Sequence, residues 1–186
     1  MSNQTTTAPQ VADPAPLGLA GFGLTTFVLS AVNAGLIPKA AEPVVLGVAL
    51  VYGGLAQFCA GMWEFQRNNT FGATAFTSYA AFWIAFALLV TFHIGGIPPE
   101  ARPAAVGTFL LGWTIFTAYM TVAAITLSRP LLVVFILLTI TFFLLTIGAF
   151  TSHAGLTVLG GYLGLITAIG AWYVSAITVI ASTRKR

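Results

Sequence analysis

The sequence predicts an all-α membrane protein, a bundle of six transmembrane helices, and two observations support this fold class. Of its 186 residues, 58% are hydrophobic and only 6% are charged, whereas about a quarter of the residues of a soluble domain are charged. A soluble fold of this size could not bury so much apolar surface. In addition, the apolar residues fall into six long runs, each close to the roughly 20 residues that a helix needs to cross a bilayer.

Each of the six runs ends at a charge, a proline or a short polar turn. The length of the runs excludes strands, and the absence of alternating apolar and polar positions excludes a closed membrane barrel. The connections are short, so successive helices should be antiparallel neighbours. We expect an N-terminal tail and helix start at 1–16, one transmembrane domain at 17–181 and a basic tail at 182–186. The runs are 17–37, 43–63, 72–94, 104–127, 131–150 and 156–181.

Lysine and arginine are unevenly shared between the two ends of the predicted bundle. With six spans both termini lie on one side, which collects Arg67, Arg129 and the basic cluster 184–186, against Lys39 and Arg102 on the other side. Basic residues favour the cytoplasmic side. We therefore expect a multi-pass protein of the cytoplasmic (inner) membrane with both termini in the cytoplasm. The first span taken alone favours the opposite orientation, because only Lys39 flanks it.

Charge is absent from the middle of every predicted span, and Glu64 falls at the end of the second one. Pumps and many symporters carry ions or protons on carboxylates inside the membrane. A bundle without them is expected to conduct passively, or to move a proton on the substrate or on a neutral side chain.

Neutral polar residues supply the candidates for lining a path through the bundle, namely Thr25, Asn33, Gln57 and Thr139. Asn33 and Gln57 are the stronger candidates, because a primary amide in lipid is costly unless it finds partners. Threonines also bond to the carbonyl four residues earlier in their own helix. For Thr25 and Thr139, pore lining and this local bonding both stay open.

The residues that would indicate an enzyme or a metal site are missing. No Ser/His/Asp set or HExxH motif occurs, and His93 and His153 have no cluster of Cys, Asp or Glu beside them. The single cysteine, Cys59, lies in an apolar run, where a small buried hydrophobic side chain is expected rather than a reactive thiol. We expect no enzymatic activity, no cofactor and no bound metal, and nothing suggests a nucleic-acid partner.

The start of the first span, residues 13–23, differs from ordinary membrane helix. Asp13 is a good N-cap, and Pro14 and Pro16 fit a helix start, where a missing N–H costs little. The free N–H groups and the positive dipole end at such a start attract small anions. A rigid helix start with no ligand is an equally good interpretation of the residues alone.

Several segments resemble one family. Residues 14–19 (Pro-Ala-Pro-Leu-Gly-Leu) resemble the signature Asn-Pro-Ala-Pro-Leu-Gly-Leu of the acetate uptake transporter family, which includes the bacterial succinate–acetate permeases. Residues 52–57 (Tyr-Gly-Gly-Leu-Ala-Gln), 60–64 (Ala-Gly-Met-Trp-Glu) and 69–79 (Asn-Thr-Phe-Gly-Ala-Thr-Ala-Phe-Thr-Ser-Tyr) continue the resemblance. Weaker similarity runs through 142–148 and the glycine-rich sixth span, so the resemblance covers nearly the whole chain.

The resemblance implies six helices around a pore in each protomer, assembly of the protomers as a hexamer, and uptake of acetate and in some members succinate. It also implies an aromatic and aliphatic constriction, formed here by Phe22, Tyr79 and Leu138. Two bulky apolar groups there would exclude water, while the Tyr79 hydroxyl would offer a hydrogen bond to a passing carboxylate.

The helix-start motif formed by Asp13, Pro14, Pro16 and Gly18 departs from the family at its first position, where the family usually has Asn. Aspartate can still cap the helix, but its charge would repel an anion at the mouth. The sequence thus predicts a conduit for acetate-like carboxylates, channel-like or proton-coupled. Two rival hypotheses are a channel for a neutral solute (undissociated acid, ammonia or water) and a scaffold or sensor without a continuous path.

Overall fold

Six helical spans, each long and apolar enough to cross a membrane, run along the long axis of the structure, a computed structural model that describes residues 11–184. Their ends lie within four residues of the predicted ones, which confirms the fold class. The first span is α1 (Ala15–Asn33). The second comprises η1 (Lys39–Ala41), α2 (Pro43–Leu50), η2 (Val51–Ala56) and α3 (Gln57–Gln66). The third comprises α4 (Thr70–Leu88), η3 (Leu89–His93) and η4 (Ile94–Gly96). The last three are α5 (Arg102–Ala124), α6 (Arg129–Thr151) and α7 (Ala154–Thr183).

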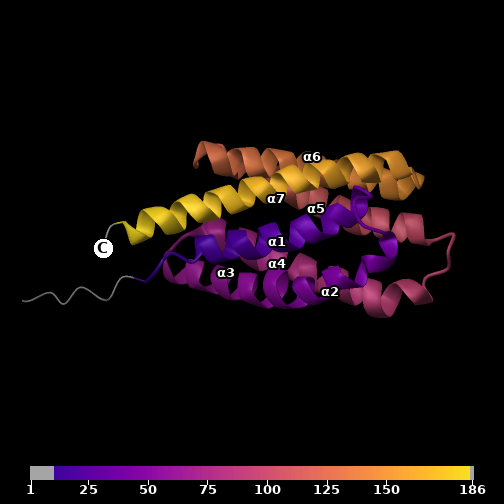
Figure 1. Ribbon diagram of the computed structural model, residues 1–186, viewed down its shortest axis with the longest axis horizontal. Coiled ribbons are helices and arrows are strands. Elements are labelled where there is room, and N and C mark those ends of the chain that lie inside the picture. The colour runs from indigo at the N-terminus through magenta and orange to yellow at the C-terminus, as the bar shows by residue number, and fades with distance from the viewer. Residues whose placement is uncertain (1–10, 185–186) are drawn as a thin grey trace, which may run out of the picture.

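The helix boundaries follow from local backbone chemistry. A proline occupies one of the first two positions of α1, α2, α5 and α6, where its fixed φ suits the helix and its missing N–H would have been unpaired anyway. After α1 the chain turns at Gly35, whose φ of +73° lies in the left-handed region that glycine adopts without strain. The first and last described helices, α1 and α7, pack along each other, with the start of α1 and the end of α7 at the same end of the bundle (Figure 1).

The second span is irregular in its middle, where η2 has the wider π-helical hydrogen bonding. Insertions of this kind often occur at functional sites. Here η2 packs against α1 at Gly21, where an added Cβ would lie only 2.6 Å from the Tyr52 carbonyl oxygen. The close contact between the two spans therefore depends on the absence of a side chain at Gly21.

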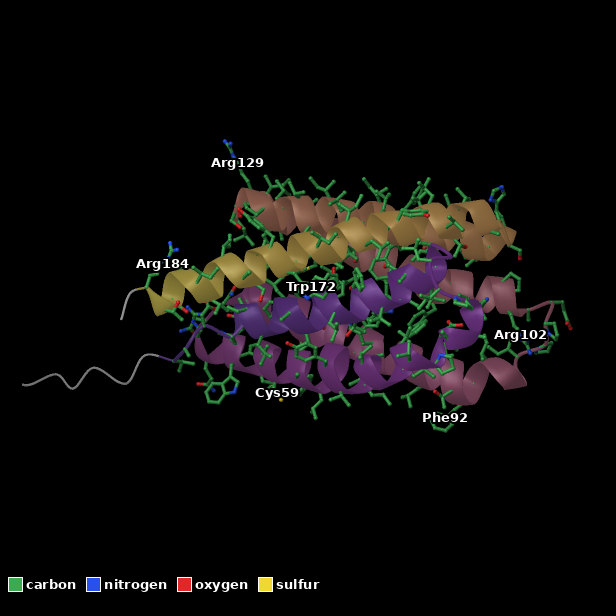
Figure 2. The ribbon with its side chains drawn as sticks, in the orientation of Figure 1. Cys59, Phe92, Arg102, Arg129, Trp172 and Arg184 are labelled. Atoms are coloured by element: carbon green, nitrogen blue, oxygen red, sulfur yellow. The ribbon has the colours of Figure 1, made fainter. Side chains whose placement is uncertain are left out.

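Aromatic and aliphatic side chains fill the interior between α4 and α6, while the outer surface is also largely apolar. The inner cluster includes Phe76, Tyr79 and Phe82 of α4 and Phe135 and Leu138 of α6. On the outside, large apolar side chains such as that of Phe92 are exposed (Figure 2), as expected of a surface that faces lipid.

Cys59 is also on this outer surface (Figure 2). The sequence-based expectation of a buried cysteine is therefore wrong. The apolar run around Cys59 reflects a lipid-facing helix surface, which composition alone does not distinguish from a protein interior.

Replacing Gly21 with alanine should destabilise the bundle by about 1–3 kcal/mol, the usual cost of overpacking a tight contact, because the new Cβ meets the Tyr52 carbonyl oxygen. Thermal unfolding of the detergent-solubilised protein measures the effect. Gly47→Ala is the matched control, since a Cβ at Gly47 in α2 meets nothing within 4 Å. Equal melting temperatures for the two variants would contradict the proposed contact.

Candidate functional site

Two cavities occupy the interior of the bundle, and Phe22 and Leu138 line both of them. Cavity 1, of about 140 Å³, extends to the end of the bundle where α1 starts and is lined there by Asp13. Cavity 2, of about 450 Å³, extends to the opposite end and is lined there by Lys39 and Arg102. The two shared side chains therefore stand between a chamber at each end.

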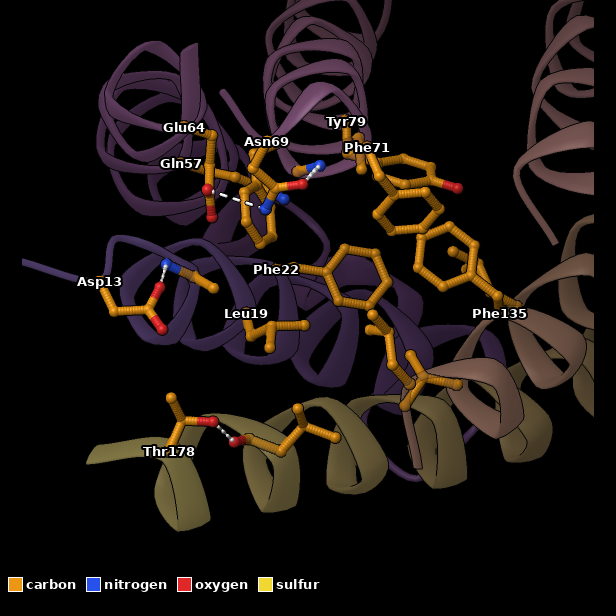
Figure 3. Close-up of a pocket in the computed structure, with 18 residues that line it drawn as sticks. Asp13, Leu19, Phe22, Gln57, Glu64, Asn69, Phe71, Tyr79, Phe135 and Thr178 are labelled. Atoms are coloured by element: carbon orange, nitrogen blue, oxygen red, sulfur yellow. Dashed lines mark hydrogen bonds between the residues drawn. The ribbon is translucent and has the colours of Figure 1, made fainter. Parts of the chain in front are cut away.

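The three residues expected to form a constriction come together at this junction. The rings of Phe22 and Tyr79 lie 5.6 Å apart between centroids, and Tyr79 lines cavity 1 beside Leu138. All three side chains are 3–5% exposed. Figure 3 shows Phe22, Tyr79 and Phe135 around the same hollow. Their packing places an apolar closure between the chambers.

The hydroxyl of Tyr79 is directed away from the path. It donates a hydrogen bond to Thr117 Oγ1 of α5 at 3.1 Å, and the Tyr79 ring packs edge-on against Phe116 of the same helix at 5.3 Å between centroids. The expectation that this hydroxyl donates to a passing carboxylate is therefore corrected, because its single proton is donated to Thr117 instead. The sequence could not reveal this partner, which lies 38 positions away.

Gln57 brings an unpartnered amide to cavity 1. Its side chain is 0% exposed, yet neither its Oε1 nor its Nε2 has a hydrogen-bond partner in the protein, and the residue lines cavity 1. A buried amide left without partners is costly. A solute or water in cavity 1 can supply the missing bonds.

Glu64 is the functional candidate that the sequence interpretation missed. The predicted second span stopped at Trp63, but α3 continues to Gln66, and this places Glu64 inside the bundle, 0% exposed and lining cavity 1. Glu64 does lie in the last turn of its span, as predicted, but the sequence interpretation did not reveal that this position is buried in the bundle. A signal was present: Glu64 follows Gln57 by seven positions, two helical turns, so the two side chains share a face.

The polar end of cavity 1 is built around the turn from α3 to α4. Asn69 caps α4 by accepting a hydrogen bond from Gly72 N–H at 3.1 Å, and its Nδ2 donates to Glu64 Oε2 at 2.9 Å. In the same turn Arg67 forms an ion pair with Asp13, the residue that precedes α1. This ion pair partly neutralises the Asp13 charge that was expected to repel anions.

The helix-start motif has a structural role in each of its members. The α1 helix begins at Ala15, and Pro14 takes the N-cap position that was predicted for Asp13. Asp13 is the residue before the N-cap, and its Oδ1 still accepts a hydrogen bond from Ala15 N–H at 3.1 Å. The Pro16 carbonyl accepts from the Ser175 hydroxyl of α7 at 2.7 Å. Gly18 leaves room for the ring of Phe76.

The remaining polar candidates divide into two groups. Asn33 lines cavity 2, as do Lys39, Glu42 and Arg102. Thr25 and Thr139 are not among the residues that line either cavity, and their hydroxyls donate to the carbonyls of Gly21 and Phe135, each four residues earlier. Of the two interpretations left open for these threonines, local bonding fits their position and pore lining does not.

Among residues 11–184, no group of three or more His, Cys, Asp or Glu side chains is placed to hold a metal ion. His153 instead caps α7, with its Nδ1 accepting from Leu156 N–H at 3.3 Å.

The family model described as the GPR1/FUN34/yaaH family matches residues 2–185 of the chain. The chain belongs to this family. The match confirms the resemblance to the succinate–acetate permeases.

Among curated relatives, the succinate-acetate/proton symporter SatP of Escherichia coli is 37% identical over 166 residues, which cover 89% of this chain and 87% of that protein. The ammonia transport outward protein 2 of Saccharomyces cerevisiae is 43% identical over 167 residues, 87% of this chain, although the chain spans only 59% of the yeast protein.

A solved structure, that of the bacterial acetate channel SatP, has the same fold. It superposes with a TM-score of 0.88 at 36% identity and covers 95% of this chain and 97% of the channel chain. This likeness agrees with a bundle of six spans that encloses a pore.

A double-mutant cycle should reveal the hydrogen bond between Tyr79 and Thr117. Tyr79→Phe should lower the free energy of unfolding by about 1 kcal/mol, and Thr117→Val by about 1–3 kcal/mol, because it leaves the phenol buried and unpaired. The double variant should lose less unfolding free energy than Thr117→Val alone. Denaturation in detergent measures these free energies. Losses that simply add would contradict the bond.

Proposed function

We propose that the protein moves acetate, with succinate as a second candidate substrate, across the cytoplasmic membrane through cavities 1 and 2. The observation that carries the proposal is the placement of Phe22 and Leu138 in the walls of both cavities. A small solute that passes these two side chains travels from one end of the bundle to the other. The printed names of the Escherichia coli relative and of the solved channel support acetate as the substrate.

The chemistry of cavity 1 suits a small monocarboxylate. Apolar side chains such as Leu19 and Val134 form most of its wall and can accept a methyl group. The unpartnered Nε2 of Gln57 is a donor for a carboxylate oxygen. Gln57 and Asn33 therefore remain our proposed polar contacts along the path, one in each cavity.

Cavity 2 has a mouth that favours anions. Lys39 and Arg102 line it together with one acidic residue, Glu42, so the charged groups of its wall carry a formal excess of one positive charge. Positive charge at the mouth of a low-dielectric cleft raises the local concentration of anions. We propose that this mouth is where acetate enters.

The proposed orientation places both termini in the cytoplasm. Arg129 and Arg184 lie at the end of the bundle where α1 starts, and Arg102 lies at the other end (Figure 2). This distribution supports the charge-based prediction. Assembly as a homohexamer in the bilayer, and transport without a cofactor or an enzymatic step, complete the proposal.

A neutral solute is the second candidate. Phe22, Tyr79 and Leu138 belong to a buried cluster of apolar side chains, and a yeast relative is named for ammonia transport. Acetate flux that follows the concentration of undissociated acid in every variant would favour this alternative.

Phe22→Ala and Tyr79→Ala should each widen the junction and change acetate flux severalfold, measured as uptake of labelled acetate into proteoliposomes. Phe143→Ala and Tyr162→Ala are matched controls, because both side chains are about half exposed and line neither cavity. Unchanged uptake in both junction variants, with correctly folded protein, would rule out the gate.

A further inference from the structure

We propose that Glu64 must carry a proton for a carboxylate to bind in cavity 1, and that the protonated Oε1 of Glu64 donates a hydrogen bond to that carboxylate. The inference rests on the proposed function. It identifies Glu64 as the residue whose protonation allows the protein to bind the anion. The proton comes from water at the α1 end of the bundle, stays on Oε1 while the carboxylate is bound, and returns to that water afterwards.

The orientation of the Glu64 carboxyl group is fixed by one of its two oxygens. Asn69 Oδ1 is held by Gly72 N–H, so the Nδ2 of the same amide faces Glu64 and donates to its Oε2 (Figure 3). The packing is tight, because a Cβ at Gly72 would lie 2.8 Å from Glu64 Cδ. The carboxyl group is therefore held in place at the wall of cavity 1.

The other oxygen is free to serve a ligand. Glu64 Oε1 is buried and has no hydrogen-bond partner in the protein. An ionised carboxylate can only accept hydrogen bonds, and so can an acetate anion, so the two cannot bond to each other. A proton on Oε1 turns it into a donor and creates a short, charge-assisted bond to the anion.

Among the described residues, no lysine or arginine lines cavity 1 to offset the negative charge of a bound carboxylate. Within the described residues, the charged side chains that line cavity 1 are Asp13, which precedes α1, and Glu64 from α3. Arg67 belongs to the same turn but pairs with Asp13. The other titratable group in the wall, Tyr79 of α4, donates to Thr117.

From α6 and α7, only uncharged side chains line cavity 1, while Arg129 and Arg184 are exposed at the ends of these helices. A carboxylate that enters cavity 1 therefore meets negative charge without a lining cation. Protonation of Glu64 removes that repulsion.

A purely structural role for Glu64 would use different atoms. The turn from α3 to α4 is held by Oε2 and by the Glu64 backbone carbonyl, which accepts from Arg67 N–H and Asn69 N–H. Glutamine at this position keeps an oxygen for Asn69 and adds a permanent N–H donor in place of the protonated Oε1. Glu64→Gln therefore preserves the turn and removes the titration.

The test is exchange of labelled acetate in proteoliposomes with the same pH on both sides and a fixed concentration of acetate anion, corrected for protein-free liposomes. The wild-type rate should be constant at low pH and fall about tenfold per pH unit above a midpoint, as expected for one required proton. Glu64→Gln should show no such fall, and one pH unit above the wild-type midpoint it should exceed the wild type by about tenfold. Glu64→Asp and the control Glu100→Gln, which alters an exposed loop carboxylate, should keep the fall.

A Glu64→Gln profile that falls like the wild type would overturn the role of Glu64 and leave transport itself intact, because the proton would then travel on the substrate. A wild type with no exchange above liposomes would overturn the proposed function and this inference with it. If Glu64→Gln does not fold, the midpoint of Glu64→Asp decides: a midpoint that differs from the wild type supports Glu64 as the titrating group, and an identical midpoint contradicts it. Formate and propionate should give the same midpoint, and a rate that keeps rising as the pH falls, with no plateau, would contradict a titrating site in the protein.

Discussion

Inside a membrane bundle no bulk water is available, so every buried polar group needs a partner within the protein, a bound solute or an ordered water. Several buried hydroxyls satisfy this constraint locally, as Thr25 and Thr141 do by donating to carbonyls of their own helices. Against that background the few unpartnered groups become informative. Gln57 and one oxygen of Glu64 lack protein partners and line cavity 1, and Thr26 Oγ1 and Trp83 Nε1 lack partners and line cavity 2. A passing solute can satisfy them.

The same constraint explains how the closure between the cavities is built. Phe22 and Leu138 need no polar partner, and Tyr79 reaches Thr117 with its hydroxyl while its ring stays at the junction. An apolar closure excludes water without leaving an unsatisfied group. The proposed polar contacts then lie on either side of it, Gln57 in cavity 1 and Asn33 in cavity 2.

The fold could be predicted from the sequence because it depends on the length of the apolar runs. The contacts of individual side chains in the site could not be predicted in this way. The convergence of Phe22, Tyr79 and Leu138 was expected only through the family resemblance, since they lie in three different helices. Glu64 was predicted at the end of its span and lies in the last turn of α3, but its burial depends on the packing of α3 against α4, which the sequence did not reveal. The partner of Tyr79 depends on how α4 packs against α5, which periodicity does not encode.

The central claim is that one path runs through the bundle and is closed at Phe22 and Leu138. Thr178→Cys in cavity 1 and Thr157→Cys in cavity 2, each in a Cys59→Ser background, test it most directly. A membrane-impermeant thiol reagent should block acetate exchange in the two variants from opposite sides of the membrane. Block of both variants from the same side, or labelled protein that exchanges acetate at the unlabelled rate, would contradict the path.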